Sequence, residues 1–423
     1  MIDTAAVGAL ADRVLGPEHK SLPPAAWGRT AGEFLATAPA LADFPTPLLT
    51  LDRAALAHNT TVMGEWASRA GVRLAPHGKT TMAPQLWADQ LAAGCWAITL
   101  ATGWQVQLAR AFGVRRIVLA NSLLDPVALT WLAGELTRDP DFEFYCWVDD
   151  PAGVRLMDEC LARAPEPVEV AVVVELGAPG GRTGVRSVAA AHRLADAVRR
   201  SCHLRLAGVG GYEAALAGDR EPGSLTAVTR YLGDLARLHR ELAEAGAYPG
   251  PAIVTAGGSA FQDLVVEHLA GLADEAGTRG APTTVVLRSG AYLVHDDGFY
   301  AGISPLAPAR SPYPLRPAMH GWARVLSAPE PGLVLLDGGK RDFPYDLGLP
   351  VPQGIAGARV SAFNDQHTFL RLPEGAAAPA LGSILRFGLS HPCTAFDKWR
   401  LIPVVDDARA AAPVVVDLVH TFF

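Results

Sequence analysis

From Thr46 to about Tyr300 the sequence alternates between two hydrophobic patterns. Short apolar or β-branched runs, which are typical of buried strands, are followed by Ala- and Leu-rich segments with apolar residues at helical spacing. We expect strands at residues 72–77, 96–101, 116–120, 143–148, 168–176, 204–209, 252–256 and 284–288. The segments between them predict helices at 83–93, 103–112, 126–136, 151–163, 187–200, 224–245 and 259–272.

Strands that alternate with helices, without a strand–strand hairpin, predict a closed parallel (β/α)8 barrel of the TIM type over residues 46–300. The structural alternative is an open, doubly wound sheet. Such a sheet usually has fewer repeats and a GxGxxG phosphate turn after its first strand. The first strand here runs instead into Gly78 and Lys79.

The helical pattern disappears after Tyr300. Short strand-like runs bounded by Gly and Pro follow, and they predict a β-rich second domain over residues 301–423. Residues 1–45 are mildly helical and rich in Ala and Pro, and we expect an N-terminal extension that packs on the body of the protein. The strand-like runs lie at 323–326, 332–337, 357–363, 366–372, 383–388 and 400–405.

Composition narrows the choice of partners and compartment. The chain has 423 residues, of which 50% are hydrophobic and 19% charged, as in ordinary globular proteins. The net charge of −7 and the absence of a Lys/Arg cluster argue against nucleic acid. No apolar run is long enough for a membrane span, and the first residues lack the pattern of a signal peptide. Five scattered cysteines without a CxxC pair indicate a reduced, cytoplasmic protein.

Reactive residue types gather at the predicted strand ends, where the active sites of such barrels lie. His77 and Lys79 follow the first strand, and their spacing lets both side chains face the same way. A lysine held in a partly dry pocket has a lowered pKa and can condense with a carbonyl. The alternative is a surface lysine whose aliphatic stem covers the end of the strand.

The segment Thr255-Ala-Gly-Gly-Ser259 follows the seventh predicted strand and runs into a helix. Its two glycines let the backbone approach an anion closely, Ser259 can cap the helix, and the N–H groups of such a turn favour phosphate. Taken alone, the segment is more often an ordinary βα turn. Paired with Lys79 it indicates pyridoxal phosphate, which needs both an amine and a phosphate site. Tyr212 either packs against this cofactor or is a core aromatic residue.

A third candidate lies in the predicted β-rich domain. His391 and Cys393 are separated by one residue, which in an extended segment directs both side chains to one side, and the two ligand types suit zinc. Two ligands do not fill a zinc shell, so water, substrate or another side chain must complete it. Asp365, His367 and Asp397 are the candidates nearby in the sequence. The alternative is a buried cysteine beside a hydrogen-bonded histidine.

Together these residues resemble the D-serine dehydratase/D-threonine aldolase family of alanine-racemase-like, fold type III pyridoxal-phosphate enzymes. The resemblance covers about residues 45–400. The matching segments are Thr46-Pro47 before Leu51-Asp52, Pro76-His77-Gly-Lys79-Thr80, Glu175-Leu-Gly177 through Arg182-Thr-Gly184, Tyr212, Thr255 to Ser259, Arg288-Ser-Gly290-Ala-Tyr292 and His391-Pro-Cys393. The departures are Ala75, Thr81 and Met82 in place of basic residues around the lysine, and Asp365-Gln366-His367 in place of Glu-Glu-His.

The resemblance implies a barrel that holds pyridoxal phosphate on Lys79, a β domain that binds a divalent metal, zinc or manganese, and a homodimer. It implies the metal ligands His391 and Cys393. Cofactor contacts are expected from Arg182, Tyr212, Thr255, Gly257, Gly258, Ser259 and Tyr292.

The expected function is a metal-assisted lyase for D-amino acids with a β-hydroxyl group. Lys79 would take the Cα proton, and the metal would stabilise the β-oxygen as it leaves. Cys393 favours a D-serine dehydratase that yields a 2-oxo acid and ammonia, because some aldolases of the family have Asp at this position. A D-threonine aldolase, with His77 or a bound water as base, is the alternative. A racemase or a binding-only homologue stays open, although a non-enzymatic cofactor carrier would usually be a lone barrel.

Overall fold

The computed structural model describes residues 1–279 and 281–423, with the backbone alone described at 276–279. Contacts divide the chain into two compact units. Unit 1 consists of residues 1–3, 64–79 and 90–290, and unit 2 of residues 4–63, 80–89 and 291–423. The predicted boundaries at residues 46 and 301 divide the chain into continuous domains, whereas each of these two units consists of several separate segments.

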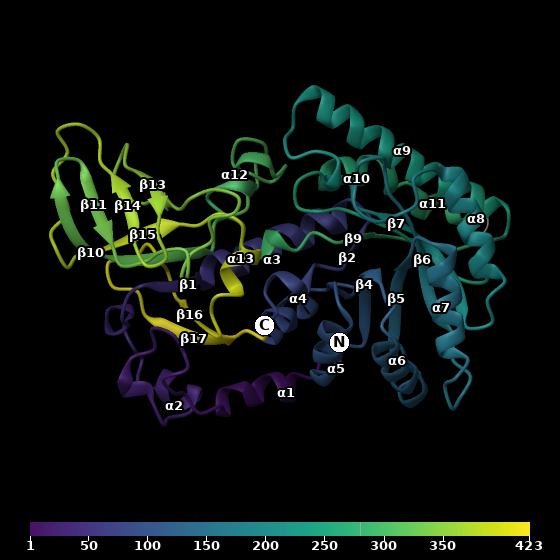
Figure 1. The fold of residues 1–423 in the computed structure, drawn as a ribbon, viewed down its shortest axis with the longest axis horizontal. Helices are drawn as coiled ribbons and strands as arrows, with labels where there is room; N and C mark the ends of the chain where they lie inside the picture. Colours follow the sequence, from purple (N-terminus) through teal and green to yellow (C-terminus); the bar gives the residue numbers. More distant parts are fainter. Residues whose placement is uncertain (280) are drawn as a thin grey trace. The chain divides into compact units, whose positions relative to one another are not determined.

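Unit 1 is a parallel barrel (Figure 1). Hydrogen-bonded neighbours run in the order β2-β9-β8-β7-β6-β5-β4-β3. The ring closes between the first two strands, because Trp96 N donates to Leu74 O over 2.6 Å and Thr99 N donates to Pro76 O over 2.9 Å. The predicted barrel is therefore confirmed. Its strands are β2 (Arg73–Leu74), β3 (Ile98–Leu100), β4 (Arg116–Ser122), β5 (Glu143–Val148), β6 (Val170–Leu176), β7 (Leu204–Gly211), β8 (Ala252–Ala256) and β9 (Thr283–Leu287).

Helices follow the strands, and local sequence signals set where several of them begin. Polar caps with proline in the first turn are favourable because the cap satisfies an otherwise unpaired N–H and proline lacks one. Asp125 and Asp150 cap α6 and α7 in this way, each with proline next, and Thr102 and Ser187 cap α5 and α8. The helices are α5 (Gly103–Ala111), α6 (Pro126–Arg138), α7 (Pro151–Leu161), α8 (Val188–Arg199), α9 (Pro222–Glu244), α10 (Gln262–Leu269) and α11 (Leu272–Arg279).

The barrel interior is filled by side chains from the strands and is a packed core, as in other barrels of this type. Burying these apolar groups stabilises the ring and fixes the ends of the strands at one face. The cluster contains Ala75, Ala97, Val118, Trp147, Val173, Ile253 and Val286, all at most 3% exposed. Residues just beyond the strand ends are therefore presented by a rigid frame.

Unit 2 is built around a mostly antiparallel sheet with the path β13-β14-β11-β10-β1-β16-β17, to which β15 and β12 add beside β10. The predicted β-rich domain is confirmed, although it recruits an N-terminal strand. Strand β1 lies at the centre, antiparallel to β10 and parallel to β16, and all five of its residues are buried. The strands are β1 (Leu48–Asp52), β10 (Met319–Glu330), β11 (Leu333–Leu336), β12 (Val351–Pro352), β13 (Arg359–Phe363), β14 (Thr368–Arg371), β15 (Ile384–Gly388), β16 (Leu401–Val405) and β17 (Val415–His420).

The N-terminal extension packs against the far end of the same sheet. Leu41 N donates to Pro413 O and Val415 N donates to Pro39 O, both over 2.9 Å. Short helices α1 (Thr4–Gly8), α2 (Ala31–Leu35), α12 (Phe299–Ile303) and α13 (Cys393–Phe396) belong to unit 2. Helices α3 (Arg53–Arg69) and α4 (Pro84–Ala92) each continue from one unit into the other along the chain.

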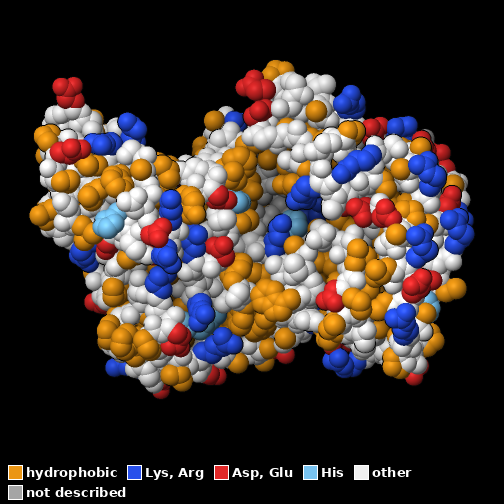
Figure 2. Space-filling model, in the orientation of Figure 1, with side chains coloured by type: hydrophobic (Ala, Val, Ile, Leu, Met, Phe, Trp, Pro, Cys, Tyr) orange, Lys and Arg blue, Asp and Glu red, His pale blue; other side chains and the backbone are white. Residues whose placement is uncertain are grey.

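Two surface properties bear on partners. Acidic and basic side chains are interspersed over the face drawn in Figure 2. None of the helices in the described part of the chain combines the length and the hydropathy that a membrane span needs.

Candidate active site

The first strand of the barrel delivers His77 and Lys79 as predicted. His77 pairs with Thr99 in the bridge that continues the closure of the ring, and Lys79 lies in the 3-10 turn Gly78–Thr80 that follows. Gly290 approaches so closely that a Cβ there would lie 2.8 Å from the backbone N and O of His77. His77 is therefore held from two sides, and only glycine fits at position 290.

The His77 ring is prepared to act as a neutral base. Burial lowers its pKa well below the ordinary value, and the positive charges of Lys79, Arg288 and Arg182 lower it further. Its Nδ1 atom is buried and has no hydrogen-bond partner among the described residues. A buried nitrogen without a partner costs free energy, which a bound group that supplies the partner would recover.

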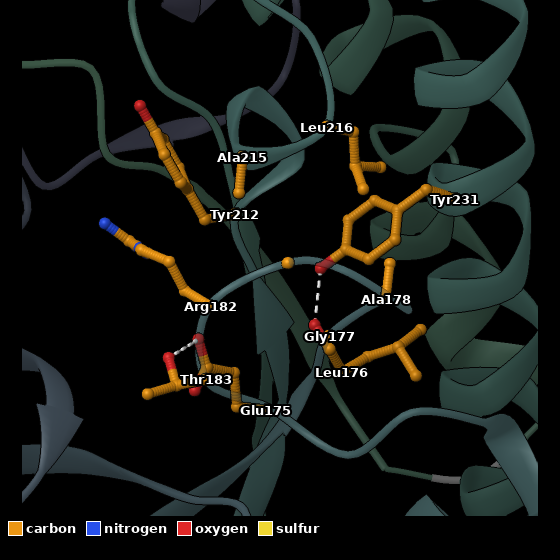
Figure 3. Close-up of a pocket in the computed structure, with 11 residues that line it drawn as sticks. Glu175, Leu176, Gly177, Ala178, Arg182, Thr183, Tyr212, Ala215, Leu216 and Tyr231 are labelled. Atoms are coloured by element: carbon orange, nitrogen blue, oxygen red, sulfur yellow. Dashed lines mark hydrogen bonds between the residues drawn. The ribbon is translucent and has the colours of Figure 1, made fainter.

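A pocket opens where β6 and β7 end (Figure 3). The guanidinium of Arg182 stacks 4.7 Å from the centre of the Tyr212 ring, so both predicted residues face one space. Glu175 accepts a 3.0 Å hydrogen bond from the Thr183 hydroxyl. Burial raises the pKa of Glu175, and the Thr183 bond opposes that rise. The lining residues also include Leu176, Gly177, Ala178, Gly181, Ala215, Leu216 and Tyr231.

The glycine-rich turn differs from the prediction in the use of its N–H groups. Gly257 N and Gly258 N each donate to the Glu213 carboxylate over 2.8 Å, and Glu213 is completely buried. In this structure an internal carboxylate accepts the bond from Gly258 N, and the contact of this turn with a phosphate stays a prediction. Sequence reasoning missed Glu213, although an acidic residue directly after a buried strand was a usable signal.

The turn also ends differently from the prediction. Helix α10 begins at Gln262, with Phe261 at its N-cap and no side-chain cap, so Ser259 does not cap it as expected. Gly257 has a φ of +103°, which only glycine adopts readily, and a Cβ at Gly258 would lie 3.0 Å from the Tyr212 ring. The turn therefore packs against Tyr212, and Ser259 lies buried beside it at 7% exposure.

Arg288 belongs to a segment that the sequence analysis matched to the family, but it was given no contact with the cofactor there. It is 1% exposed, and its guanidinium donates to the Thr255 hydroxyl and to Gly211 O over 2.6 Å each. Burial lowers its pKa, and the charge of Glu213 is the largest effect that raises it. Its Nε is buried without a partner, so this end of the barrel holds one more donor for a bound acceptor.

These observations fit pyridoxal phosphate at the barrel end. An amine, a cationic stack on an aromatic ring, and two buried nitrogens without partners surround the strand ends of one unit. Tyr292 lies in the 3-10 turn Ala291–Leu293 of unit 2, where it is 1% exposed, so its contact with the cofactor stays a prediction.

In unit 2, His391 and Cys393 are partners despite a different backbone from the one expected. The segment is not extended: His391 has a φ of +52°, Pro392 is helical, and Cys393 opens α13. The Cys393 thiol nevertheless lies close enough to the His391 ring to raise the pKa of that ring. Burial lowers the pKa of His391, but Cys393 and Asp346 outweigh burial and raise it to about 9. The turn, rather than a strand, therefore brings the two side chains together.

The other sequence candidates for a third ligand do not reach this pair. Asp365 pairs instead with Arg341 over 3.5 Å, and His367 and Asp397 are exposed. The residue missed is Asp346, whose Oδ2 lies 2.6 Å from Nδ1 of His391. Throughout the described residues, no group of three or more His, Cys, Asp or Glu side chains is arranged to hold a metal. The nitrogen and sulfur donors of His391 and Cys393 suit a divalent ion. They would fill only part of its coordination shell, and water or substrate would complete it.

One further contact lies beside Cys393. The Thr80 hydroxyl is 3.5 Å from the Cys393 sulfur, and Thr80 directly follows Lys79 in the chain.

Comparison with known proteins agrees with the resemblance read from the motifs. Residues 318–405 match the family model described as a putative serine dehydratase domain. D-threonine aldolase from an Arthrobacter species is 29% identical over 367 residues, which cover 87% of this chain and 90% of that protein. The 3-hydroxy-D-aspartate aldolase of Paracoccus denitrificans is 25% identical over 342 residues, which cover 79% and 82%.

Solved structures have the same architecture. D-threonine aldolase from Filomicrobium marinum superposes with a TM-score of 0.76 at 26% identity, covering 90% of this chain and 96% of that one. D-threo-3-hydroxyaspartate dehydratase from a Delftia species gives 0.68 at 20% identity, covering 90% and 99%, and shows the shared fold. The predicted relationship and the predicted fold class are both confirmed.

Proposed function

We propose that this chain is a pyridoxal-phosphate-dependent lyase that cleaves D-amino acids carrying a β-hydroxyl group, by retro-aldol cleavage to glycine and an aldehyde. The observation that carries the proposal is Lys79 at the end of the first barrel strand, two residues after a neutral, half-buried histidine. Similarity to D-threonine aldolase over 87% of the chain supports the reaction and the substrate class.

Pyridoxal phosphate supplies an electron sink for negative charge that develops at Cα. Lys79 would hold the cofactor through its amine and would carry a proton to or from Cα once the substrate amine has taken its place. Arg182 and Tyr212 form the wall of the pocket beside it. Arg288, fixed by Thr255 and Gly211, keeps a positive charge inside the barrel end and counters the negative charge of a bound anion.

His77 is suited to remove the proton of the β-hydroxyl. The lowered pKa keeps the His77 ring neutral across the physiological range, so it can accept a proton, although it also makes the ring a weaker base that needs an acidified hydroxyl group as its partner. A divalent cation supplies a Lewis acid that acidifies a hydroxyl group. His391 and Cys393 would hold that ion, and the two remaining positions of a four-coordinate shell would be open to water or substrate.

β-Elimination to a 2-oxo acid and ammonia is the second candidate reaction. Cys393 favours it, because the resemblance to the family associates Asp at this position with some of its aldolases. The match of residues 318–405 to a serine dehydratase domain supports the same reaction. Both reactions use Lys79 and the metal pair, and they differ in which bond to Cβ breaks.

One assay separates the two reactions. The purified protein, supplied with pyridoxal phosphate and zinc or manganese, is incubated with D-threonine, D-serine and their L enantiomers, and glycine, aldehyde, 2-oxo acid and ammonia are measured. Equal amounts of glycine and acetaldehyde from D-threonine are expected. A 2-oxo acid with ammonia would instead establish elimination, and conversion of one enantiomer into the other without cleavage would overturn the lyase proposal.

We also propose that the protein acts as a homodimer in a reducing, cytoplasmic compartment. All five cysteines are reduced and none forms a disulfide. Light scattering after size exclusion should give twice the mass of 44.5 kDa, and the monomer mass would contradict the dimer.

A further inference from the structure

Three side chains of unit 2 form a closed hydrogen-bonded set around the His391 ring, which we name the His391 clamp: His391, Asp346 and Thr394. One carboxylate oxygen of Asp346 lies 2.6 Å from Nδ1 of His391, and the other accepts a 2.7 Å bond from the Thr394 hydroxyl. Both oxygens of Asp346 are therefore engaged. The carboxylate is fixed in one orientation and in turn fixes the plane of the ring.

The backbone of His391 is held separately. Its φ of +52° lies in the left-handed region, which is unfavourable for a residue with a side chain. Asp296, 1% exposed, accepts a 3.0 Å bond from His391 N through Oδ2. The Oδ1 atom of Asp296 accepts from Gly298 N and Tyr300 N at the start of α12. A buried carboxylate thus keeps the main chain in the conformation that presents the ring to Cys393.

We infer that Asp346 is a positioning residue for the metal: it sets the tautomer and orientation of His391, and so controls how tightly His391 and Cys393 bind a divalent ion. The inference rests on the proposed metal role of these two residues. A neutral imidazole carries its proton on one nitrogen only. When Nδ1–H donates to a carboxylate, the lone pair lies on Nε2, and the ring becomes a better ligand.

Asp346 is not itself assigned as a ligand. Its two oxygens already bond to His391 and Thr394, and it lies on the Nδ1 side of the ring. Its effect must therefore pass through His391. The clamp also favours ion binding by a site with only two protein ligands, because the His391 ring needs little reorganisation when the ion arrives.

The test measures zinc affinity of the cofactor-loaded, chelator-treated protein by competition with a fluorescent zinc chelator. Asp346→Ala should weaken binding about 10- to 100-fold, the usual effect of removing such a partner. Asp346→Asn keeps an acceptor for Nδ1–H but loses the charge, and Thr394→Val removes one bond to the carboxylate. Each of these two should cost about fivefold, the worth of one ordinary hydrogen bond.

Asp417→Ala is the matched control. Asp417 is a carboxylate of the same unit with two partners, Arg53 and Leu418 N, and its side chain is 34% exposed against 40% for Asp346. It should leave zinc affinity unchanged. Cobalt provides the second readout: at saturation, Asp346→Ala should develop the full thiolate-to-cobalt charge-transfer band, because Cys393 still binds. Should Asp346→Ala fail to fold, the Asn variant carries the test with the same direction.

The outcomes separate this inference from the proposed function. If His391→Ala abolishes zinc binding while Asp346→Ala and Asp346→Asn bind like the wild type, the positioning role is wrong and the metal site stands. If His391→Ala binds zinc like the wild type, the metal site is elsewhere and the proposed function loses its metal pair. Equal weakening by Asp417→Ala and Asp346→Ala would assign the effect to general surface charge and would also overturn the inference.

Discussion

The two candidate regions of the molecule hold their charged groups in opposite ways. At the end of the barrel, Glu213 and Arg288 are 0% and 1% exposed and are bonded to the backbone of neighbouring turns. In unit 2, the side chains of His391 and Asp346 are 19% and 40% exposed. They contact each other, and Asp346 also accepts a hydrogen bond from Thr394. The buried groups at the barrel end therefore contribute both to the site and to the stability of the barrel. The partly exposed groups of unit 2 interact only with their neighbours.

This difference in burial predicts which substitutions change cofactor binding in the barrel and which change metal binding in unit 2. Removing one member of a buried charged pair leaves the other uncompensated, which is costly for the fold. A partly exposed pair can lose a member to solvent at little cost. We therefore expect barrel substitutions to change stability and cofactor binding together. Substitutions at His391 or Cys393 should change metal binding and turnover, with stability and cofactor binding preserved.

The largest expected effect is that of Lys79→Ala. The variant loses both the cofactor linkage and the amine that carries the Cα proton, and the second loss alone is worth about 10²–10⁴-fold in rate. Borohydride reduction of the wild type followed by peptide mapping should label Lys79, and the variant should stay unlabelled with an unchanged circular dichroism spectrum. Lys340→Ala, at an exposed lysine of unit 2, is the control. A label on another lysine would contradict the assignment.

The next largest effect is a loss of turnover with unchanged cofactor binding, which distinguishes the metal pair of unit 2 from the barrel end. His391→Ala or Cys393→Ala should lower turnover of D-β-hydroxy amino acids by about 10²–10⁴-fold, since a metal contributes several kcal/mol at about 1.4 kcal/mol per factor of ten. Cofactor absorbance and affinity should not change. His367→Ala tests an exposed histidine that the sequence offered as a ligand, and it should behave like the wild type. Loss of the cofactor in the His391 variant would show that the two regions are not separable.

A smaller effect is expected in the barrel, where one substitution should lower both the free energy of unfolding and the affinity for the cofactor. Glu213→Gln can keep one of the two bonds from Gly257 and Gly258 and removes the charge that faces Arg288. We expect the first unfolding transition in urea to lose about 3–5 kcal/mol, as when a buried pair is broken, with weaker binding of pyridoxal phosphate. Glu221→Gln, at an exposed glutamate, is the control. Unchanged affinity for pyridoxal phosphate together with unchanged stability would show that Glu213 supports neither the site nor the fold.

The smallest effect concerns pH. Burial and then the neighbouring charge of Asp296 raise the pKa of Asp297 from 3.8 to about 6. Because the folded state then binds the proton more tightly than the unfolded state, the stabilising contribution is complete below pH 4 and is lost as the pH rises through about 6. Each displaced pKa unit is worth about 1.4 kcal/mol. Asp297→Asn should flatten this part of the stability profile, and an unchanged profile would assign the pH dependence to other groups.

Local pattern was enough to predict the barrel, because each strand is an apolar run followed by a helix of regular spacing. It was not enough for β1, whose five residues pair with strands that come more than 260 residues later in the chain. The pattern of α3 is interrupted by His58, Asn59 and two threonines, so helical spacing is weak there. The interleaving of the two units follows from these two elements, and only tertiary pairing reveals it.

The same limit applies to the site. Lys79, His77 and the His391–Cys393 pair could be named because their chemistry is unusual at their positions in the sequence. Glu213, Arg288 and Asp346 act through partners between 33 and 77 residues away, and no spacing rule relates such positions. The expected extended geometry at His391 failed because the backbone there is held by Asp296, a contact that spans 95 residues.

The separation of the two regions is tested most directly by titrating the holoenzyme with a chelator while visible cofactor absorbance and cleavage of D-threonine are followed in one sample. We predict that cleavage is lost while the absorbance stays, and that zinc or manganese restores cleavage without added cofactor. Cleavage that persists after exhaustive chelation, with no metal found by elemental analysis, would contradict the account.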